Sequence, residues 1–165
     1  MARREIEQPV KLSLIDRLID SDPNSNSDST MVRANSVRLL KSSLRRDLEW
    51  LLNTRRIPDA ADKSFLELSR SVYNFGLPDA TALNHQVVAD RERLLRMLET
   101  TVATFEPRLS RVRITPVENP GKVHVLRFQI EGLLSMDPEP ERICFDTVLQ
   151  LSSGGFEVKG EPGAG

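Results

Sequence analysis

The sequence Phe105-Glu106-Pro107-Arg108-Leu109 places an acidic and a basic residue two positions apart around a proline. Proline cannot continue a helix, and it favours extended geometry for the residue before it. Because residues i and i+2 of an extended segment point the same way, Glu106 and Arg108 are expected to project together. Such a pair can bind complementary charges on a partner protein. It can also be a surface ion pair that closes a helix, worth about 0 to 1 kcal/mol.

Residues suited to catalysis or metal binding are few. His85 and His124 fall on different predicted elements, and neither has metal-site spacing with Cys144 or with carboxylates. A glycosidase needs one carboxyl group that stays protonated, whereas a neighbouring Arg108 favours the ionised form of Glu106. Cys144, on a predicted strand, is expected to be a packed side chain. The sequence therefore predicts no catalytic residue, no metal site and no cofactor.

The composition limits the classes of protein and partner. The 165 residues suit one domain, and 23 Lys and Arg against 24 Asp and Glu leave no basic field for a nucleic acid. The single cysteine excludes an intrachain disulfide framework and fits a reducing compartment. No apolar run approaches the roughly 18 residues of a membrane span. We therefore expect a soluble, cytoplasmic protein with no direct membrane insertion and no nucleic-acid partner.

Residues 1–35 are predicted to form an N-terminal tail with a short docking segment. Leu14, Ile15 and Leu18 lie at helical spacing, in a stripe too short to be stable alone in water. The next stretch, residues 20–30, is rich in Ser, Asn and Asp and is expected to be a flexible linker. The stripe either packs on the chain's own core or docks on another protein, and its tethering favours docking.

Two long segments have the pattern of amphipathic helices. Residues 36–54 and 84–105 repeat apolar residues at intervals of three and four. The two predicted stripes are Val37, Leu40, Leu44, Leu48 and Leu51, then Val87, Leu94, Leu98, Val102 and Phe105. A shorter helical segment is expected to place Phe65, Leu68 and Val72 on one side. It is followed by a turn in which Gly76 permits a positive φ.

After Pro107 the apolar period changes from about 3.6 to 2. Residues 112–115, 126–131 and 143–151 alternate as strands, and residues 156–159 could add a short fourth strand. Short turns between them favour antiparallel neighbours. We predict an α+β domain over residues 36–159, with two long amphipathic helices packed on one face of a small, mainly antiparallel sheet of three to four strands. Residues 160–165 are expected to be a disordered C-terminal tail.

Several segments occur in an order that resembles the TssE family, the baseplate subunits of the bacterial type VI secretion system. They are S-L-I-D-R-L at residues 13–18, the Ser- and Asn-rich linker, the helical sequence at 36–56, Y-N-F-G-L-P-D at 73–79, and F-E-P-R-L at 105–109 followed by strands. That family is itself similar to tailed-phage baseplate wedge proteins once labelled lysozyme-like.

The resemblance implies a non-enzymatic part of a contractile injection machine. The E-P-R element is the hallmark of the family, so its role is carried onto Glu106, Pro107 and Arg108 as partner-binding residues. The implied partners are the wedge subunits TssF and TssG, with TssK as a further candidate, and the sheath subunits TssB and TssC. The implied location is the cytoplasm, in a baseplate assembled at the inner membrane.

Strand edges are templates for strand addition by another chain, so the sheet is expected to anchor or template the sheath. Two other functions stay open. A small regulatory adaptor would form a stable complex with one soluble partner and need no baseplate. A peptidoglycan glycoside hydrolase would cleave cell walls in a reaction that depends on Glu106.

Overall fold

The computed structural model describes Leu18 and residues 33–58, 64–80, 82–84, 86–118, 124–136 and 139–160. It divides the chain into two compact units, Met1–Leu44 and Arg45–Gly165. Leu14 and Ile15 lie outside the described residues. Leu18 is helical, and 83% of its surface is exposed.

The first long helix, α2, spans Arg33–Asn53, close to the predicted 36–54. Its predicted apolar stripe is confirmed, because Leu40, Leu44, Leu48 and Leu51 are all buried, while Val37 is half-buried. Intervals of three and four residues keep these leucines on one side of a helix with 3.6 residues per turn. Trp50, on the other side, is 68% exposed.

The second long helix, α4, spans Val88–Phe105 and begins four residues later than predicted. The side chain of Asn84 accepts a hydrogen bond from the Gln86 backbone N–H, and the Asn84 carbonyl accepts one from Val87. Asparagine offers the backbone a local turn in place of a helical bond, and that turn occupies the predicted first turn of the helix. Val87 is accordingly 45% exposed, whereas Leu94, Leu98 and Val102 are buried.

Two short helical elements, α3 at Leu66–Ser69 and η1 at Val72–Asn74, occupy the region between the long helices. Phe65 and Val72 are 61% and 88% exposed, so they do not form a buried stripe with Leu68. The physical reason is the break at Ser71, whose side chain accepts a hydrogen bond from the Tyr73 N–H and starts a new element.

Gly76 closes the turn after η1 and has the predicted positive φ, +108°. A Cβ at this position would lie 2.5 Å from the carbonyl oxygen of Thr54. That close approach accommodates a parallel bridge in which Leu77 donates to Thr54 and accepts from Arg56. The turn thus fixes the loop before α4 to the segment after α2.

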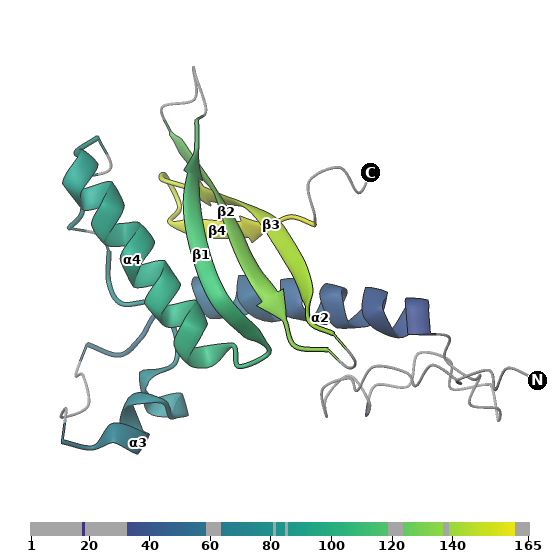
Figure 1. The fold of residues 1–165 in the computed structure, drawn as a ribbon. Coiled ribbons are helices and arrows are strands. Elements are labelled where there is room, and N and C mark those ends of the chain that lie inside the picture. The colour runs from purple at the N-terminus through teal and green to yellow at the C-terminus, as the bar shows by residue number, and fades with distance from the viewer. Residues whose placement is uncertain are drawn as a thin grey trace, which may run out of the picture. The chain divides into compact units, whose positions relative to one another are not determined.

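Four strands follow α4 and form one antiparallel sheet in the order β1-β2-β3-β4 (Figure 1). The strands are β1 at Leu109–Val117, β2 at Val125–Leu134, β3 at Glu141–Gln150 and β4 at Gly155–Val158. The predicted α+β class and the four-stranded sheet are confirmed. Helix α4 lies along β1, which immediately follows it in the chain.

The two faces of the sheet differ as strand alternation requires. One face is buried and apolar, with Ile114, Phe128, Ile130, Leu134, Ile143, Phe145, Leu149, Phe156 and Val158. The other face carries cross-strand polar pairs, including Arg142 with Glu131 at 2.8 Å and Gln129 with Asp146 at 2.8 Å. The register of β1 with β2 shifts between Ser110 and Arg113, where Arg111 has a φ of +52°, as a β-bulge does.

Candidate protein-interaction site

Glu106 and Arg108 form a bidentate ion pair at the turn between α4 and β1. Arg108 Nε donates to Glu106 Oε1 at 2.6 Å, and Arg108 Nη2 donates to Glu106 Oε2 at 2.6 Å. The Glu106 N–H still completes the last turn of α4 by donating to Val102, and the Glu106 carbonyl accepts from Leu109. The two side chains therefore do project together, and they face each other across Pro107.

A third charged group joins this pair from a distant part of the chain. Arg108 Nη2 also donates to Asp47 Oδ2 at 2.7 Å, and Asp47 Oδ1 accepts two hydrogen bonds from Arg46. Because Asp47 lies on α2, the bond joins that helix to the junction of α4 and β1. We call Asp47, Glu106 and Arg108 the clamp.

Sequence reasoning missed Asp47. Its only signal was its place beside the buried Leu48, at the border of the apolar stripe, and nothing in its spacing pointed to a residue 61 positions away.

The clamp is mostly withdrawn from solvent. The side chain of Glu106 is 7% exposed, that of Arg108 24% and that of Asp47 28%. The hydrogen bond to Glu106 raises the pKa of Arg108 above its ordinary value, and the charge of Asp47 adds to the effect. The pair is thus not the exposed ion pair of the alternative interpretation. Pro107 is exposed, and the partly exposed Arg108 leaves a polar edge beside it.

The outer edge of β4 is covered by side chains of α2. Asn53 donates to the Phe156 carbonyl and accepts from the Phe156 N–H, at 2.8 and 2.9 Å. The Val158 carbonyl accepts from Arg45, and the Val158 N–H donates to Glu49. These side chains occupy the backbone groups that an added strand would bind.

The outer edge of β1 is covered in a different way. The Ile114 N–H donates to Glu99 Oε1 on α4 at 2.7 Å, so it is not available to another strand. Two positions further on, Pro116 has no N–H to offer. The β1 edge therefore lacks donors at two successive outward positions.

Comparison with known proteins identifies the family of this chain. The model of the family described as "Baseplate wedge protein gp25" matches residues 38–139, from α2 through β2. The chain belongs to the gp25 baseplate wedge family. A solved structure entitled "The baseplate complex from the type VI secretion system" contains a chain that is 22% identical. The match covers 68% of this chain and 96% of that chain, with a TM-score of 0.46. No curated protein matches.

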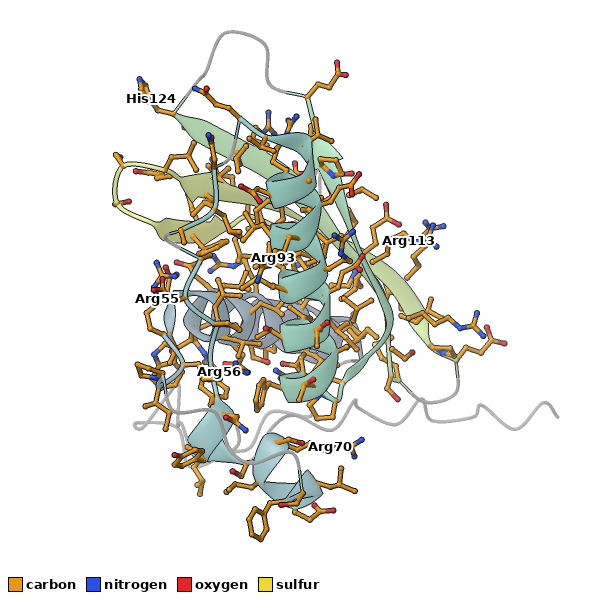
Figure 2. The ribbon with its side chains drawn as sticks, turned by 90° about the vertical axis from the view of Figure 1, so that its left-hand side faces the viewer. Arg55, Arg56, Arg70, Arg93, Arg113 and His124 are labelled. Carbon is orange, nitrogen blue, oxygen red and sulfur yellow. The ribbon has the colours of Figure 1, made fainter. Side chains whose placement is uncertain are left out.

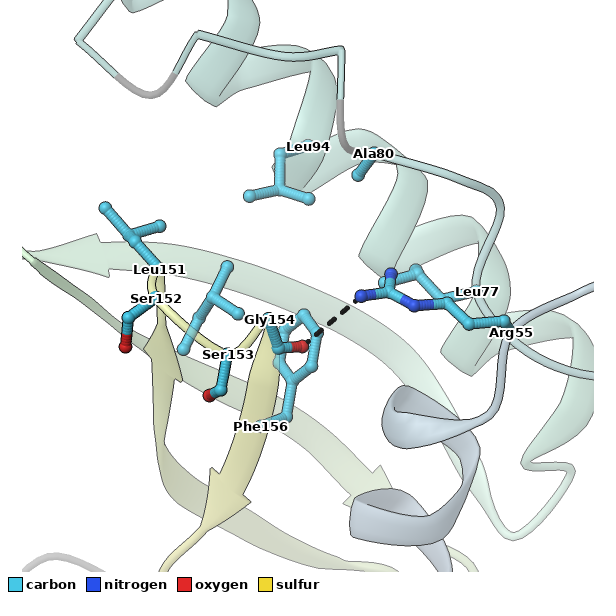
Figure 3. Close-up of a pocket in the computed structure, with 10 residues that line it drawn as sticks. Arg55, Leu77, Ala80, Leu94, Leu151, Ser152, Ser153, Gly154 and Phe156 are labelled. Atoms are coloured by element: carbon cyan, nitrogen blue, oxygen red, sulfur yellow. Dashed lines mark hydrogen bonds between the residues drawn. The ribbon is translucent and has the colours of Figure 1, made fainter.

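The wedge-family domain also contains a small pocket of about 290 Å³ beside the turn between β3 and β4 (Figure 3). Arg55 reaches this turn and donates to the Gly154 carbonyl at 3.4 Å. Gly154 has a φ of +67°, a backbone conformation that glycine adopts readily in a turn. The rest of the lining is mostly apolar and includes Leu77, Leu94 and Phe156.

Of the histidines and the cysteine considered for catalysis, the structure describes two, and they lie on different strands or beside them. Cys144 is half-buried on β3, His124 is exposed next to β2, and His85 lies outside the described residues. In the described ranges there is no group of three His, Cys, Asp or Glu residues that could hold a metal ion. None of the helices that the structure describes has both the length and the apolar character to cross a membrane.

Proposed function

We propose that this wedge-family protein is a structural, non-enzymatic subunit of a type VI secretion baseplate in the cytoplasm, assembled at the inner membrane. The observation that carries the proposal is the family match over residues 38–139. Those residues include all three members of the clamp, the whole of α4, and α2 from residue 38 onward. The resemblance of the sequence to the TssE family supports the choice of secretion system.

The clamp has two roles in this proposal. Inside the chain it holds the junction of α4 and β1 against α2 through Asp47, Glu106 and Arg108. Outward, the exposed Pro107 and the edge of Arg108 bind the wedge subunits TssF and TssG, with TssK as a further candidate. A partly exposed guanidinium retains donors for a partner carboxylate or carbonyl group.

Co-purification with TssF and TssG tests the outward role. Arg108→Ala should weaken association by about 2 to 5 kcal/mol, the cost of leaving a charge buried and unpaired in an interface. Because Arg108→Ala also removes an internal contact, Pro107→Asp separates the two roles. It changes an exposed side chain, so binding should fall while the free energy of unfolding changes by no more than about 1 kcal/mol.

Arg113→Ala is the matched control, since Arg113 is an exposed arginine on the polar face of the sheet. If both Pro107→Asp and Arg108→Ala co-purify with as much TssF and TssG as the wild type does, binding through the E-P-R element is refuted.

Sheath anchoring is proposed at the β4 edge. There the backbone donors and acceptors of Phe156 and Val158 are all present, and side chains of α2 bind them. A strand from TssB or TssC could displace those side chains and form main-chain hydrogen bonds with the same backbone groups. The β1 edge is less suitable because Pro116 removes a donor permanently.

The N-terminal segment with Leu14, Ile15 and Leu18 is proposed as a second docking element for a baseplate partner. The exposure of Leu18 agrees with this role. The hydrolase alternative receives no support from the site, because both carboxylate oxygens of Glu106 accept hydrogen bonds from Arg108. A general acid needs a proton on one of those oxygens. The regulatory adaptor has no structural observation in its favour.

A further inference from the structure

A groove of about 490 Å³, whose lining includes no residue of the clamp, lies between α4, the segment after α2, and the region from α3 to Pro78. Four arginines from three parts of the chain line it, namely Arg56, Arg70, Arg93 and Arg96. Figure 2 labels the first three of them. The lining also includes Met97 and Thr101.

Most of the positive charge of the groove has no ion-pair partner among the residues that the structure describes. Among the described residues, none forms an ion pair or a side-chain hydrogen bond with the guanidinium of Arg56, Arg70 or Arg93. Arg96 has only an exposed partner one turn away, Glu92 at 3.5 Å. The formal net charge of the chain is −1, so a concentration of arginines in one groove is a local feature.

Beside the groove, α3 and η1 expose apolar side chains. Phe65, Leu66, Val72 and Tyr73 are 61%, 75%, 88% and 44% exposed, and Arg70 lies between the two elements in the sequence. Exposed apolar patches of this kind mark interaction sites. Aromatic side chains together with arginines are the residues most enriched in protein interfaces and in their hot spots.

We propose that this arginine groove and the adjoining α3–η1 surface bind an acidic segment of a partner protein in which apolar side chains alternate with carboxylates. A guanidinium group can donate two parallel hydrogen bonds to one carboxylate of the segment. The apolar residues of the segment would cover Phe65 and Tyr73. A protein segment fits better than a nucleic acid because the groove has no run of aromatic residues for base stacking and the chain has no overall positive charge. This surface goes beyond the wedge- and sheath-binding role, since it shares no residue with the clamp or the β4 edge.

Fluorescence anisotropy with a defined probe tests the proposal on the full chain. The probe is a fluorescein-labelled peptide, Glu-Leu-Glu-Glu-Phe-Glu-Leu-Glu, and its counterpart has glutamine at every glutamate. The wild-type chain should bind the glutamate peptide and not the glutamine peptide. Binding should weaken when salt rises from about 50 to about 300 mM, because mobile ions screen the charges. Amide shifts of Met97 and Thr100 in NMR spectra should locate the peptide in the groove.

Two variants distinguish specific binding of the peptide in the groove from general electrostatic attraction to the protein surface. The double variant Arg70→Ala with Arg93→Ala should lower the affinity about tenfold or more, while Arg113→Ala, outside the groove, should stay within about twofold of wild type. Neither change removes an ion pair or a side-chain hydrogen bond among the described residues, so circular dichroism should be unchanged. Equal losses in both variants, equal binding of the glutamine peptide, or tighter binding of a polyuridine oligonucleotide would each overturn the proposal.

Discussion

Replacement of Arg108 by alanine is the sharpest test of the clamp as an internal contact. The change removes two hydrogen bonds to Glu106 and one to Asp47. Hydrogen bonds to charged groups contribute about 1.5 to 3 kcal/mol each, but three bonds from one guanidinium are not additive. Removal of one partner of a buried pair costs about 3 to 5 kcal/mol.

The exposure of the clamp places Arg108→Ala at the lower end of that range. Asp47 is 28% exposed and keeps Arg46, so water and that arginine compensate part of its loss. Glu106 is only 7% exposed, and its carboxylate would retain one donor, the backbone N–H of residue 108. We therefore expect a loss of about 3 kcal/mol in the free energy of unfolding. The melting temperature should fall by about 6 to 12 °C.

Urea unfolding followed by far-ultraviolet circular dichroism measures the loss in the free energy of unfolding. The slope m of the variant is compared with that of the wild type. Circular dichroism is preferable to tryptophan fluorescence because Trp50 is 68% exposed. Arg46→Ala is the control; its exposed pair with Asp47 should cost less than about 1 kcal/mol. A double variant, Glu106→Leu with Arg108→Met, should recover much of the stability because the most buried charge of the clamp is removed together with its partner, while Asp47 keeps Arg46. A loss below about 1 kcal/mol in Arg108→Ala would refute the clamp.

Three further predictions follow from the turn, the covered edge and the N-terminal segment. Gly76→Ala should destabilise the domain by about 2 to 4 kcal/mol, from strain at a positive φ and a clash with Thr54 O; Gly160→Ala, which meets nothing within 4 Å, should be neutral in the same thermal melts. Glu49→Ala with Asn53→Ala uncovers the β4 edge and should increase self-association in light scattering; an unchanged monomer would contradict the covering role. Deletion of residues 1–20 should reduce binding of baseplate partners at an unchanged melting temperature, whereas a lower melting temperature would indicate that the segment packs on its own core.

The sequence predicted those parts of the fold that depend on local periodicity. The leucines of α2 and the alternating residues of β2 and β3 are buried as expected, because 3.6 and 2 are the repeats of helix and strand. The start of α4 was placed too early because the turn at Asn84 depends on one side chain and leaves the apolar pattern intact. Phe65 and Val72 follow a helical spacing, but the chain breaks at Ser71 before that spacing can form a stripe.

The candidate site was predicted only in its local part. Glu106 and Arg108 are neighbours in sequence, so their pairing follows from backbone geometry. Asp47 and the covered sheet edges could not be found, because each joins segments far apart in the chain through side-chain contacts. Such contacts depend on how the helices cross the sheet, and one sequence without its relatives does not determine that crossing. The arginine groove was missed for the same reason, since three separate segments contribute to it.

The mass of the complex formed with purified TssF and TssG tests the central claim most directly. Size-exclusion chromatography with light scattering would show whether the chain, at 18.6 kDa, joins these subunits. A structural wedge subunit should co-elute with them in a complex of fixed stoichiometry, and Pro107→Asp should reduce the co-eluting fraction. Elution of the wild-type chain by itself at 18.6 kDa, beside a complete complex of TssF and TssG, would contradict the proposed function.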